Sequence, residues 1–295
     1  MEPLEAQPLV SIVTPSFNQG AFIAATIDSV LAQDYPRLEY LVVDAGSTDT
    51  TLELLRSYGE RVRWISEPDH GQADAINKGI TLTRGAIVAW LNADDLYLAG
   101  AVARAVAELQ AHPQAALVYG QAEFIDRNGA LLGPCAQVEP FSLDRLINDL
   151  DFIVQPATFF RRDAFLAVGG LDAQLRYCLD YDLWIKLAVR YQVRYLPELL
   201  ARVRIYPTTK TASGGLERLE EIERMIGRYG RRRLPALFYG EMVRVCWAVG
   251  RLALARHDWR QLAQVARRGA VYGAALALRW ASRRSWRVES SSWTD

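Results

Sequence analysis

Four short apolar runs in the first hundred residues, each followed by a segment with helical spacing, constrain the fold of this chain most strongly. The runs are apolar on both faces, as strands are when helices cover a sheet on two sides. Strands that alternate with helices form a parallel sheet, because each helix carries the chain back to the same edge. We therefore expect an α/β fold with a Rossmann-like, mostly parallel sheet flanked by helices. The predicted strands comprise residues 9–14, 38–43, 61–66 and 86–91.

The later part of the chain changes character twice. Residues 115–205 contain several shorter strand-like runs and a helical segment near residues 180–191. After residues 211–215 the composition shifts to arginine, alanine, leucine and tryptophan at helical spacing. We predict one α/β domain over residues 1–214 and a basic, tryptophan-rich helical extension over residues 215–295.

The cysteines and the apolar runs exclude several classes of protein. Cys135, Cys178 and Cys246 are far apart and form no CxxC pair, which argues against a disulfide scaffold or a structural zinc site. The first residues lack the positive and apolar regions of a signal peptide, and no run of about 18 apolar residues could span a membrane. These features favour a cytoplasmic location.

The charges are distributed unevenly, although the formal net charge is zero. Residues 226–288 contain fourteen arginines and two acids, and five of the eight tryptophans follow residue 240. Such helices suit peripheral contact with the anionic inner face of a membrane. They equally suit a helical hairpin with tryptophans in its core, packed on the first domain or on a second subunit of a homo-oligomer. Nothing else in the chain favours nucleic-acid binding.

Polar clusters follow each of the four predicted strands, and in parallel sheets ligands bind beyond these strand ends. The chain has no Gly-rich phosphate loop, so an acidic edge of the sheet requires a divalent cation to hold a diphosphate. Carboxylate oxygens suit Mg²⁺ or Mn²⁺. For a lone Asp-Asp pair, a common alternative is that Asp95 caps the following helix. The clusters are residues 15–18, 44–49, 67–74 and 92–95.

In this order, "VSIVTPSFNQG", "VVDAGSTDTT", "SEPDHGQADAINKGI" and "GAIVAWLNADDLY" resemble the family 2 glycosyltransferases, which have the GT-A fold. The resemblance extends from about Pro8 to about Lys210. It implies a nucleotide-sugar half over about residues 1–120 and an acceptor half over about residues 121–214. It also implies a hexosyltransferase-type enzyme that moves a sugar from a nucleotide diphosphate sugar, with UDP favoured, to an acceptor hydroxyl with inversion. A glycan or lipid-linked acceptor would fit the biosynthesis of a surface polysaccharide or glycolipid.

The resemblance also implies roles for individual residues. The nucleobase of the donor would donate a hydrogen bond to Asp44. Asp95 would be the direct ligand of Mg²⁺ or Mn²⁺ in the DxD-type motif. Asp94 would lie nearer the ribose or the donor sugar and would be a second ligand of the metal. The residues expected to bind the nucleotide sugar are Thr14, Pro15, Ser16, Asn18, Asp44, Ser47, Asp69, Gln72, Asp74, Asn77, Lys78, Asn92 and Asp94.

Two positions depart from the family pattern. Asn92 replaces an acidic residue, and its amide can still bond to a sugar or to water. Tyr206 stands near a position where relatives often have a histidine. We therefore expect metal coordination to depend on Asp95, with Arg204 or Lys210 neutralising the phosphates.

The general base is expected in "CLDYDLWIKL", where Asp180 aligns with the acid of the family and Asp182 is the reserve. Asp182 precedes Lys186 by four residues, which suits an exposed ion pair on a helix. Trp184 is expected to pack in the interior.

Two other functions remain open from the sequence. One is a sugar nucleotidyltransferase, although "TPSFNQG" lacks the basic residue expected in the first loop of such an enzyme. The other is a protein that binds nucleotide sugars without catalysis, in which Asp180 would have no chemical role.

Overall fold

The computed structural model describes residues 3–149, 151–230, 236–255 and 257–289. Contacts divide the chain into two units. The sheet unit comprises residues 1–146 and 150–209, and the helical unit comprises residues 147–149 and 210–295. The division after Thr209 lies close to the composition shift in the sequence.

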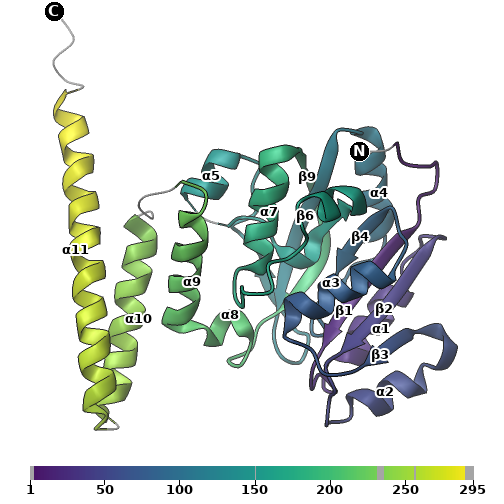
Figure 1. The fold of residues 1–295 in the computed structure, drawn as a ribbon, viewed down its shortest axis with the longest axis horizontal. Helices are drawn as coiled ribbons and strands as arrows, with labels where there is room; N and C mark the ends of the chain where they lie inside the picture. Colours follow the sequence, from purple (N-terminus) through teal and green to yellow (C-terminus); the bar gives the residue numbers. More distant parts are fainter. Residues whose placement is uncertain (1–2, 150, 231–235, 256, 290–295) are drawn as a thin grey trace, which may run out of the picture. The chain divides into compact units, whose positions relative to one another are not determined.

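The first half of the sheet unit has the predicted parallel architecture (Figure 1). Its strands lie in the order β3-β2-β1-β4, and all three pairings are parallel. The strands are β1 (Val10–Ser16), β2 (Leu38–Asp44), β3 (Arg63–Ser66) and β4 (Ile87–Trp90). The segments between and after them are α1 (Ile23–Leu31), α2 (Thr51–Ser57), the short 3₁₀ turn η1 (Gly59–Arg61), α3 (Gln72–Leu82) and α4 (Ala101–Ala111).

The second half makes the sheet mixed. It continues from β4 in the order β8-β6-β9-β5, with β7 on β6, and only the β6–β9 pairing is parallel. These strands are β5 (Leu96–Tyr97), β6 (Ala115–Ile125), β7 (Leu131–Pro134), β8 (Thr158–Arg161) and β9 (Gln192–Arg204). The remaining helical segments of this part of the chain are α5 (Leu143–Asn148), η2 (Gln155–Ala157), α6 (Arg162–Ala167) and α7 (Leu179–Arg190).

β6 and β9 are each one long strand, where the sequence predicts several shorter ones. Gly120 looks like a strand break, but a Cβ there would lie 2.6 Å from the Leu200 side chain and 2.7 Å from the Glu198 carbonyl oxygen. The glycine therefore permits close approach of β9, and register shifts in the pairing absorb the irregularity.

Helices cover both faces of the sheet. α3 packs through Gly79, where a Cβ would lie 2.4 Å from the Val13 side chain. The opposite face contacts α1 and α4 through buried side chains such as Ile27 and Val102. Trp184 of α7 is fully buried, as predicted, and stacks on Trp90 of β4 with ring centroids 5.6 Å apart. This stack joins the acceptor half expected from the sequence to the end of β4.

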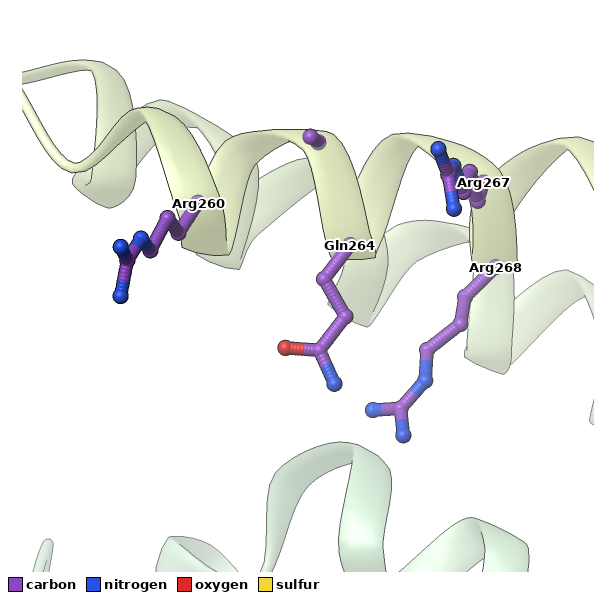
Figure 2. A pocket seen from close by; sticks show the side chains of 5 residues that line it. Arg260, Gln264, Arg267 and Arg268 are labelled. Carbon is purple, nitrogen blue, oxygen red and sulfur yellow. The ribbon is translucent and has the colours of Figure 1, made fainter.

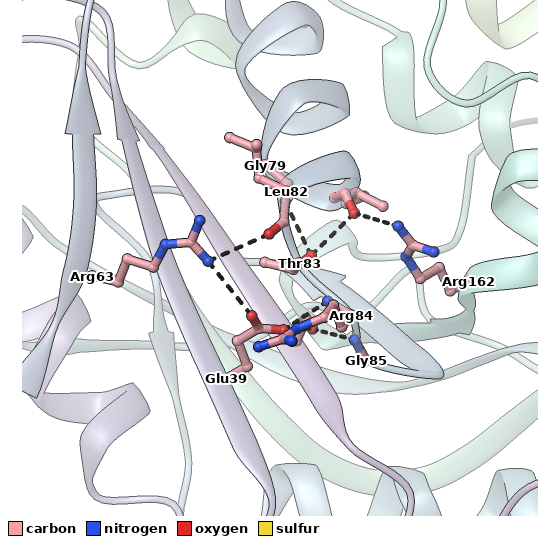
Figure 3. A network of polar contacts seen from close by, with 10 residues as sticks. Glu39, Arg63, Gly79, Leu82, Thr83, Arg84, Gly85 and Arg162 are labelled. Atoms are coloured by element: carbon pink, nitrogen blue, oxygen red, sulfur yellow. Dashed lines mark hydrogen bonds and ion pairs between the residues drawn. The ribbon is translucent and has the colours of Figure 1, made fainter.

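The amino-terminal edge of the parallel strands is closed by its own polar groups (Figure 3). Glu39 Oε2 accepts hydrogen bonds from Ser11 Oγ (2.7 Å) and from the Arg84 N–H (2.8 Å). The Arg63 guanidinium lies 3.7 Å from Glu39, and the Gly85 N–H donates to Ser11 Oγ (2.8 Å). These groups satisfy one another, so the polar clusters at the other edge are the better candidates for a ligand site.

The helical unit consists mainly of a hairpin of two long helices. α10 (Ala236–Ala255) and α11 (Trp259–Glu289) lie side by side, and α9 (Gly215–Gly227) packs on α10, preceded by α8 (Lys210–Ser213) (Figure 1). The Tyr272 hydroxyl donates to Glu220 (3.1 Å), and Arg268 pairs with the same carboxylate (3.3 Å). None of the helices in the described parts of the chain has the length and apolar content needed to cross a bilayer.

The hairpin that the sequence allowed is therefore present, but its described tryptophans are not core residues. Trp247 is 66% exposed and Trp259 is 60% exposed. The side chains of Trp280 and Trp286, and the whole of Trp293, lie outside what the structure describes.

Candidate functional site

The parallel register brings the carboxyl ends of the first four strands to one edge. Ser16 of β1 pairs with Asp44 of β2, and Asp44 pairs with Ser66 of β3. β4 pairs with β1 as far as Trp90, and the chain then continues into Asn92-Ala93-Asp94-Asp95. The predicted polar clusters thus follow neighbouring strand ends. We call this edge the rim.

Asp44 organises the middle of the rim. Its carboxylate is fully buried and accepts bonds from the main-chain N–H groups of Gly46 (3.0 Å) and Ser47 (2.9 Å). It also accepts bonds from the hydroxyls of Ser47 (2.5 Å) and Ser66 (2.7 Å). These bonds hold the loop after β2 against the end of β3.

The loops after β1 and β2 are tied together. The Asn18 N–H donates to Ser47 Oγ (2.7 Å), and Asn18 Oδ1 accepts from the Thr48 N–H (2.9 Å). The Gly20 N–H donates to Asp49 Oδ2 (2.9 Å). Asn18 has a left-handed backbone (φ 53°), a conformation that asparagine tolerates better than most residues. The two loops therefore form a preorganised wall of the rim.

The predicted residues at the end of β1 differ in orientation. Thr14 and Pro15 are buried, and the Thr14 hydroxyl shares a hydrogen bond with the Tyr40 hydroxyl (3.0 Å) inside the protein. Ser16 Oγ is buried and has no hydrogen-bond partner among the described residues. Buried hydroxyls are normally paired, so Ser16 Oγ has an unused hydrogen bond at the rim.

Two aspartates hold the backbone of the loop before α3 through hydrogen bonds. Asp69 Oδ1 accepts from the Gly71 N–H (2.8 Å), and Asp74 Oδ2 accepts from the His70 N–H (3.1 Å). These bonds leave His70 exposed on the loop.

Asn77 and Lys78, farther along α3, engage other parts of the protein. The Asn77 amide donates to the Leu171 carbonyl (2.9 Å) and accepts from the Leu171 N–H (3.0 Å). Lys78 Nζ donates to Glu67 (2.9 Å), and this contact raises the pKa of the lysine. In the structure, both side chains thus join α3 to neighbouring loops.

A chain of amides connects α3 to the end of β4. Gln72 Nε2 donates to Asn92 Oδ1 (2.8 Å), and Asn92 Nδ2 donates to Asp95 Oδ2 (3.0 Å) and to Gln155 Oε1 (3.0 Å). Gln155 in turn donates to the Trp90 carbonyl (2.8 Å). Asn92 therefore supports Asp95 by donating a bond that an aspartate could not donate. Gln155 was not predicted, because its only local signal is the proline that follows it.

Asp94 and Asp95 lie where their surroundings disfavour the charged forms of both carboxyls. Asp95 is 4% exposed, and burial, followed by the neighbouring Asp94 charge, raises its pKa well above the usual range. Burial also raises the pKa of Asp94, which is only partly covered. The ionised forms of both adjacent carboxyls are therefore disfavoured. A bound cation would offset this cost by placing positive charge beside them.

The donor set fits a hard divalent cation. Both acids offer carboxylate oxygens, which Mg²⁺ and Mn²⁺ prefer, and such ions commonly use one or two protein carboxylates. Among the described residues, no group of three or more His, Cys, Asp and Glu side chains could form an all-protein metal site. A cation at Asp94 and Asp95 would therefore complete its shell with ligand and water oxygens.

Tyr206 and Arg204 both contact this acidic pair. The Tyr206 hydroxyl donates to Asp94 Oδ2 (2.9 Å), and the Arg204 N–H donates to Asp95 Oδ1 (3.0 Å). The Arg204 guanidinium donates to the carbonyls of Asp94 (2.9 Å), Asp126 (3.1 Å) and Arg127 (3.0 Å). Arg204 is buried, and these bonds join the acidic pair to the β6–β7 turn. The prediction that Arg204 or Lys210 neutralises the phosphates stays a prediction.

An aromatic and cationic cluster supports Tyr206. Its ring lies 5.0 Å from that of Phe22, and the Arg127 guanidinium lies over both rings at 5.3 and 5.6 Å. Phe22 and Arg127 were not predicted, because their contacts connect distant segments of the chain.

The two candidate bases have different surroundings at the start of α7. Asp182 is 1% exposed and pairs with Lys186 (2.9 Å), so the ion pair is present but its carboxylate is buried, not exposed as predicted. Asp180 is half-buried in the first turn, where the helix dipole favours a negative charge. It precedes Trp184 by one turn on the same helix face, and Trp184 stacks on Trp90 at the end of β4.

Comparison with known proteins adds the family context. Residues 11–168 match Glycosyl transferase family 2. An uncharacterized glycosyltransferase of Rickettsia typhi is 30% identical over 228 residues, which cover 73% of this chain and 70% of the relative. A PGL/p-HBAD biosynthesis glycosyltransferase of Mycobacterium tuberculosis is 34% identical over 186 residues, which cover 61% and 70%.

Two solved structures share the fold. TarS residues 1–349 of S. aureus, in complex with UDP-GlcNAc, aligns with a TM-score of 0.63 and 14% identity over 94% of this chain and 92% of that chain. The mannosyltransferase PcManGT of Pyrobaculum calidifontis, in complex with GDP-Man and Mn²⁺, aligns with a TM-score of 0.61 and 20% identity over 97% and 83%. The likeness confirms the predicted GT-A fold.

Proposed function

The chain belongs to glycosyl transferase family 2 and is a glycosyltransferase, and we propose that it moves a sugar from a UDP-sugar to an acceptor hydroxyl with inversion. The observation that carries this proposal is the pair Asp94–Asp95 at the rim, where burial disfavours two adjacent negative charges. The nucleotide sugars bound by TarS and PcManGT support the class of donor.

Asp94 and Asp95 are the residues proposed to hold Mg²⁺ or Mn²⁺, and the Mn²⁺ in the PcManGT complex supports a divalent ion in this fold. When bound, the cation supplies positive charge beside the departing diphosphate. Asn92 and Tyr206 hold the two carboxylates in position through the bonds described above.

The nucleoside is proposed to lie against the loops after β1, β2 and β3. Ser16 Oγ, which is buried with its hydrogen bond unused, supports a polar contact there. Asp44 remains the predicted acceptor for the nucleobase, and its four internal donors also make it the residue that holds the loop after β2 in place.

Asp180 is the proposed general base. The acceptor oxygen forms a bond to the anomeric carbon while the bond from that carbon to the diphosphate oxygen breaks. The acceptor proton passes to Asp180, and attack opposite the leaving group inverts the anomeric centre. The position of Asp180 one turn before the Trp184–Trp90 stack supports this role, because the stack fixes the start of α7 relative to β4.

The acceptor is proposed to be a glycan or a lipid-linked molecule of a surface polysaccharide or glycolipid. The relative named for PGL/p-HBAD biosynthesis supports this class.

A panel of nucleotide sugars, assayed with and without Mn²⁺ for the released nucleoside diphosphate, tests the proposal. We expect metal-dependent release from at least one UDP-sugar. Release of pyrophosphate would instead indicate a nucleotidyltransferase, and binding without any turnover would indicate a non-catalytic binding protein.

The variant D180N tests the base. Loss of a general base lowers turnover by about 10²- to 10⁴-fold. UDP binding should be unchanged, because the role proposed for Asp180 is on the acceptor side. Turnover equal to that of the wild type would exclude Asp180 and direct attention to Asp182.

A further inference from the structure

α10 presents an exposed stripe that combines arginine with large apolar side chains. Arg244, Trp247, Arg251 and Leu254 follow at intervals of three or four residues, which places them on one side of the helix. All four are exposed, Trp247 to 66% and Leu254 to 54%. The Arg251 guanidinium lies 4.9 Å over the Trp247 ring. We call these four residues the α10 stripe.

α11 adds positive charge to the same hairpin. Figure 2 shows Arg260, Gln264, Arg267 and Arg268 along this helix, where they line a shallow hollow with Ala263. Arg268 is neutralised by Glu220, with 3.3 Å between the paired atoms. Arg260 and Arg267 are exposed, so their charges contribute to the potential around the hairpin.

The side chains of the α10 stripe indicate the kind of surface that it binds. An indole with an arginine stacked on it has an apolar body and a cationic edge, the combination found at the boundary between lipid headgroups and acyl chains. A second copy of the stripe would be a poor partner, because its arginines would meet like charges. An anionic surface complements the fourteen arginines and two acids of residues 226–288.

We propose that the α10 stripe docks this enzyme on the surface of an anionic lipid bilayer. α10 lies along the surface, with Trp247 and Leu254 at the level of the headgroups. Arg244 and Arg251 pair with the anionic headgroups on either side. The binding is peripheral and weakens as the salt concentration rises, because its electrostatic part is screened.

Sedimentation of the full chain with vesicles tests this surface. We expect binding to an equimolar mixture of phosphatidylcholine and phosphatidylglycerol and much weaker binding to phosphatidylcholine alone. An arginine near an anionic surface contributes about 1 kcal/mol, so R244Q/R251Q should lower the partition coefficient about 30-fold. The variant W247A should also lower it, and at high salt as well.

The matched control is R56Q/R61Q on the sheet unit. Both arginines are exposed, and Arg61 lies 5.0 Å over the Tyr58 ring, close to the 4.9 Å of Arg251 over Trp247. This control should bind vesicles like the wild type.

Three results would overturn the proposal. They are a wild-type chain that does not bind the anionic vesicles, a stripe variant that binds as well as the wild type, and an equal loss of binding in R56Q/R61Q.

A change in the oligomeric state of a stripe variant, measured by light scattering with vesicle binding intact, would assign the stripe to contact with a second copy of the chain. Far-UV circular dichroism verifies the helices of each variant, and W247A carries the test if R244Q/R251Q loses helix.

Discussion

The variant Y206F tests how the acidic pair is held. Phenylalanine keeps the ring that packs on Phe22 and under Arg127 but removes the hydroxyl that donates to Asp94 Oδ2. The change therefore isolates one hydrogen bond without opening a cavity.

The structure sets the size of the expected effect. A hydrogen bond to a charged acceptor contributes about 1.5–3 kcal/mol, which corresponds to roughly 10- to 150-fold in an equilibrium constant. Asp94 is only partly covered, so water replaces part of the lost bond, and the lower end applies. Loss of a residue that orients a metal ligand costs a similar 10- to 100-fold. We expect Y206F to bind Mn²⁺ about tenfold more weakly in the presence of UDP.

The pH dependence gives a second, independent readout. The bond from Tyr206 lowers the pKa of Asp94, which burial raises. Removing it raises that pKa further, so protons compete with Mn²⁺ up to a higher pH. The deficit of Y206F should therefore grow as the pH falls, and the midpoint of Mn²⁺ binding should move upward.

Calorimetric titration of Mn²⁺ into protein saturated with UDP measures both effects. Y35F is the matched control, because Tyr35 donates its hydroxyl to the Pro8 carbonyl (2.6 Å), away from the acidic pair. Equal Mn²⁺ affinity and an equal pH midpoint in Y206F and the wild type, with UDP binding intact, would refute the role assigned to Tyr206.

Three further variants test the surrounding structure. E39A removes the hydrogen-bond acceptor at the amino-terminal edge of the sheet. Urea denaturation should show that the free energy of unfolding falls by about 2 kcal/mol, while UDP binding is retained. A loss of UDP binding would contradict the view that this edge and the rim act separately. K186M removes a partner of the buried Asp182 and should cost about 3 kcal/mol in the same assay, so wild-type stability would show that the pair matters little. W184F weakens the stack on Trp90 and should cost about 1–2 kcal/mol and lower turnover more than Mn²⁺ affinity; an unchanged turnover would argue against the stack as the element that positions α7.

The parallel half of the fold could be predicted because its signals are local. Each of the first four strands is an apolar run, and parallel strands direct their carboxyl ends to one edge. The acids at positions 94 and 95 could therefore be assigned to a shared rim from the sequence.

The remaining features depend on contacts between distant segments. Gly120 resembles a break until β9 is placed beside it, and the burial of Asp182 follows from packing around α7. Nothing near Arg204 in the sequence reveals the carbonyls of the β6–β7 turn that it binds. Long-range pairing, and not local propensity, decided these positions.

The Trp90–Trp184 stack limits how such an enzyme can be recombined with its relatives. Trp90 belongs to the nucleotide-sugar half expected from the sequence and Trp184 to the expected acceptor half, and both indoles are fully buried. A chimera that takes residues 121–214 from another glycosyltransferase imports a new partner for Trp90 and shifts the helix that carries Asp180. An exchange of residues 121–214 should therefore include the matching residue at the end of β4, which makes positions 90 and 184 a pair to exchange jointly.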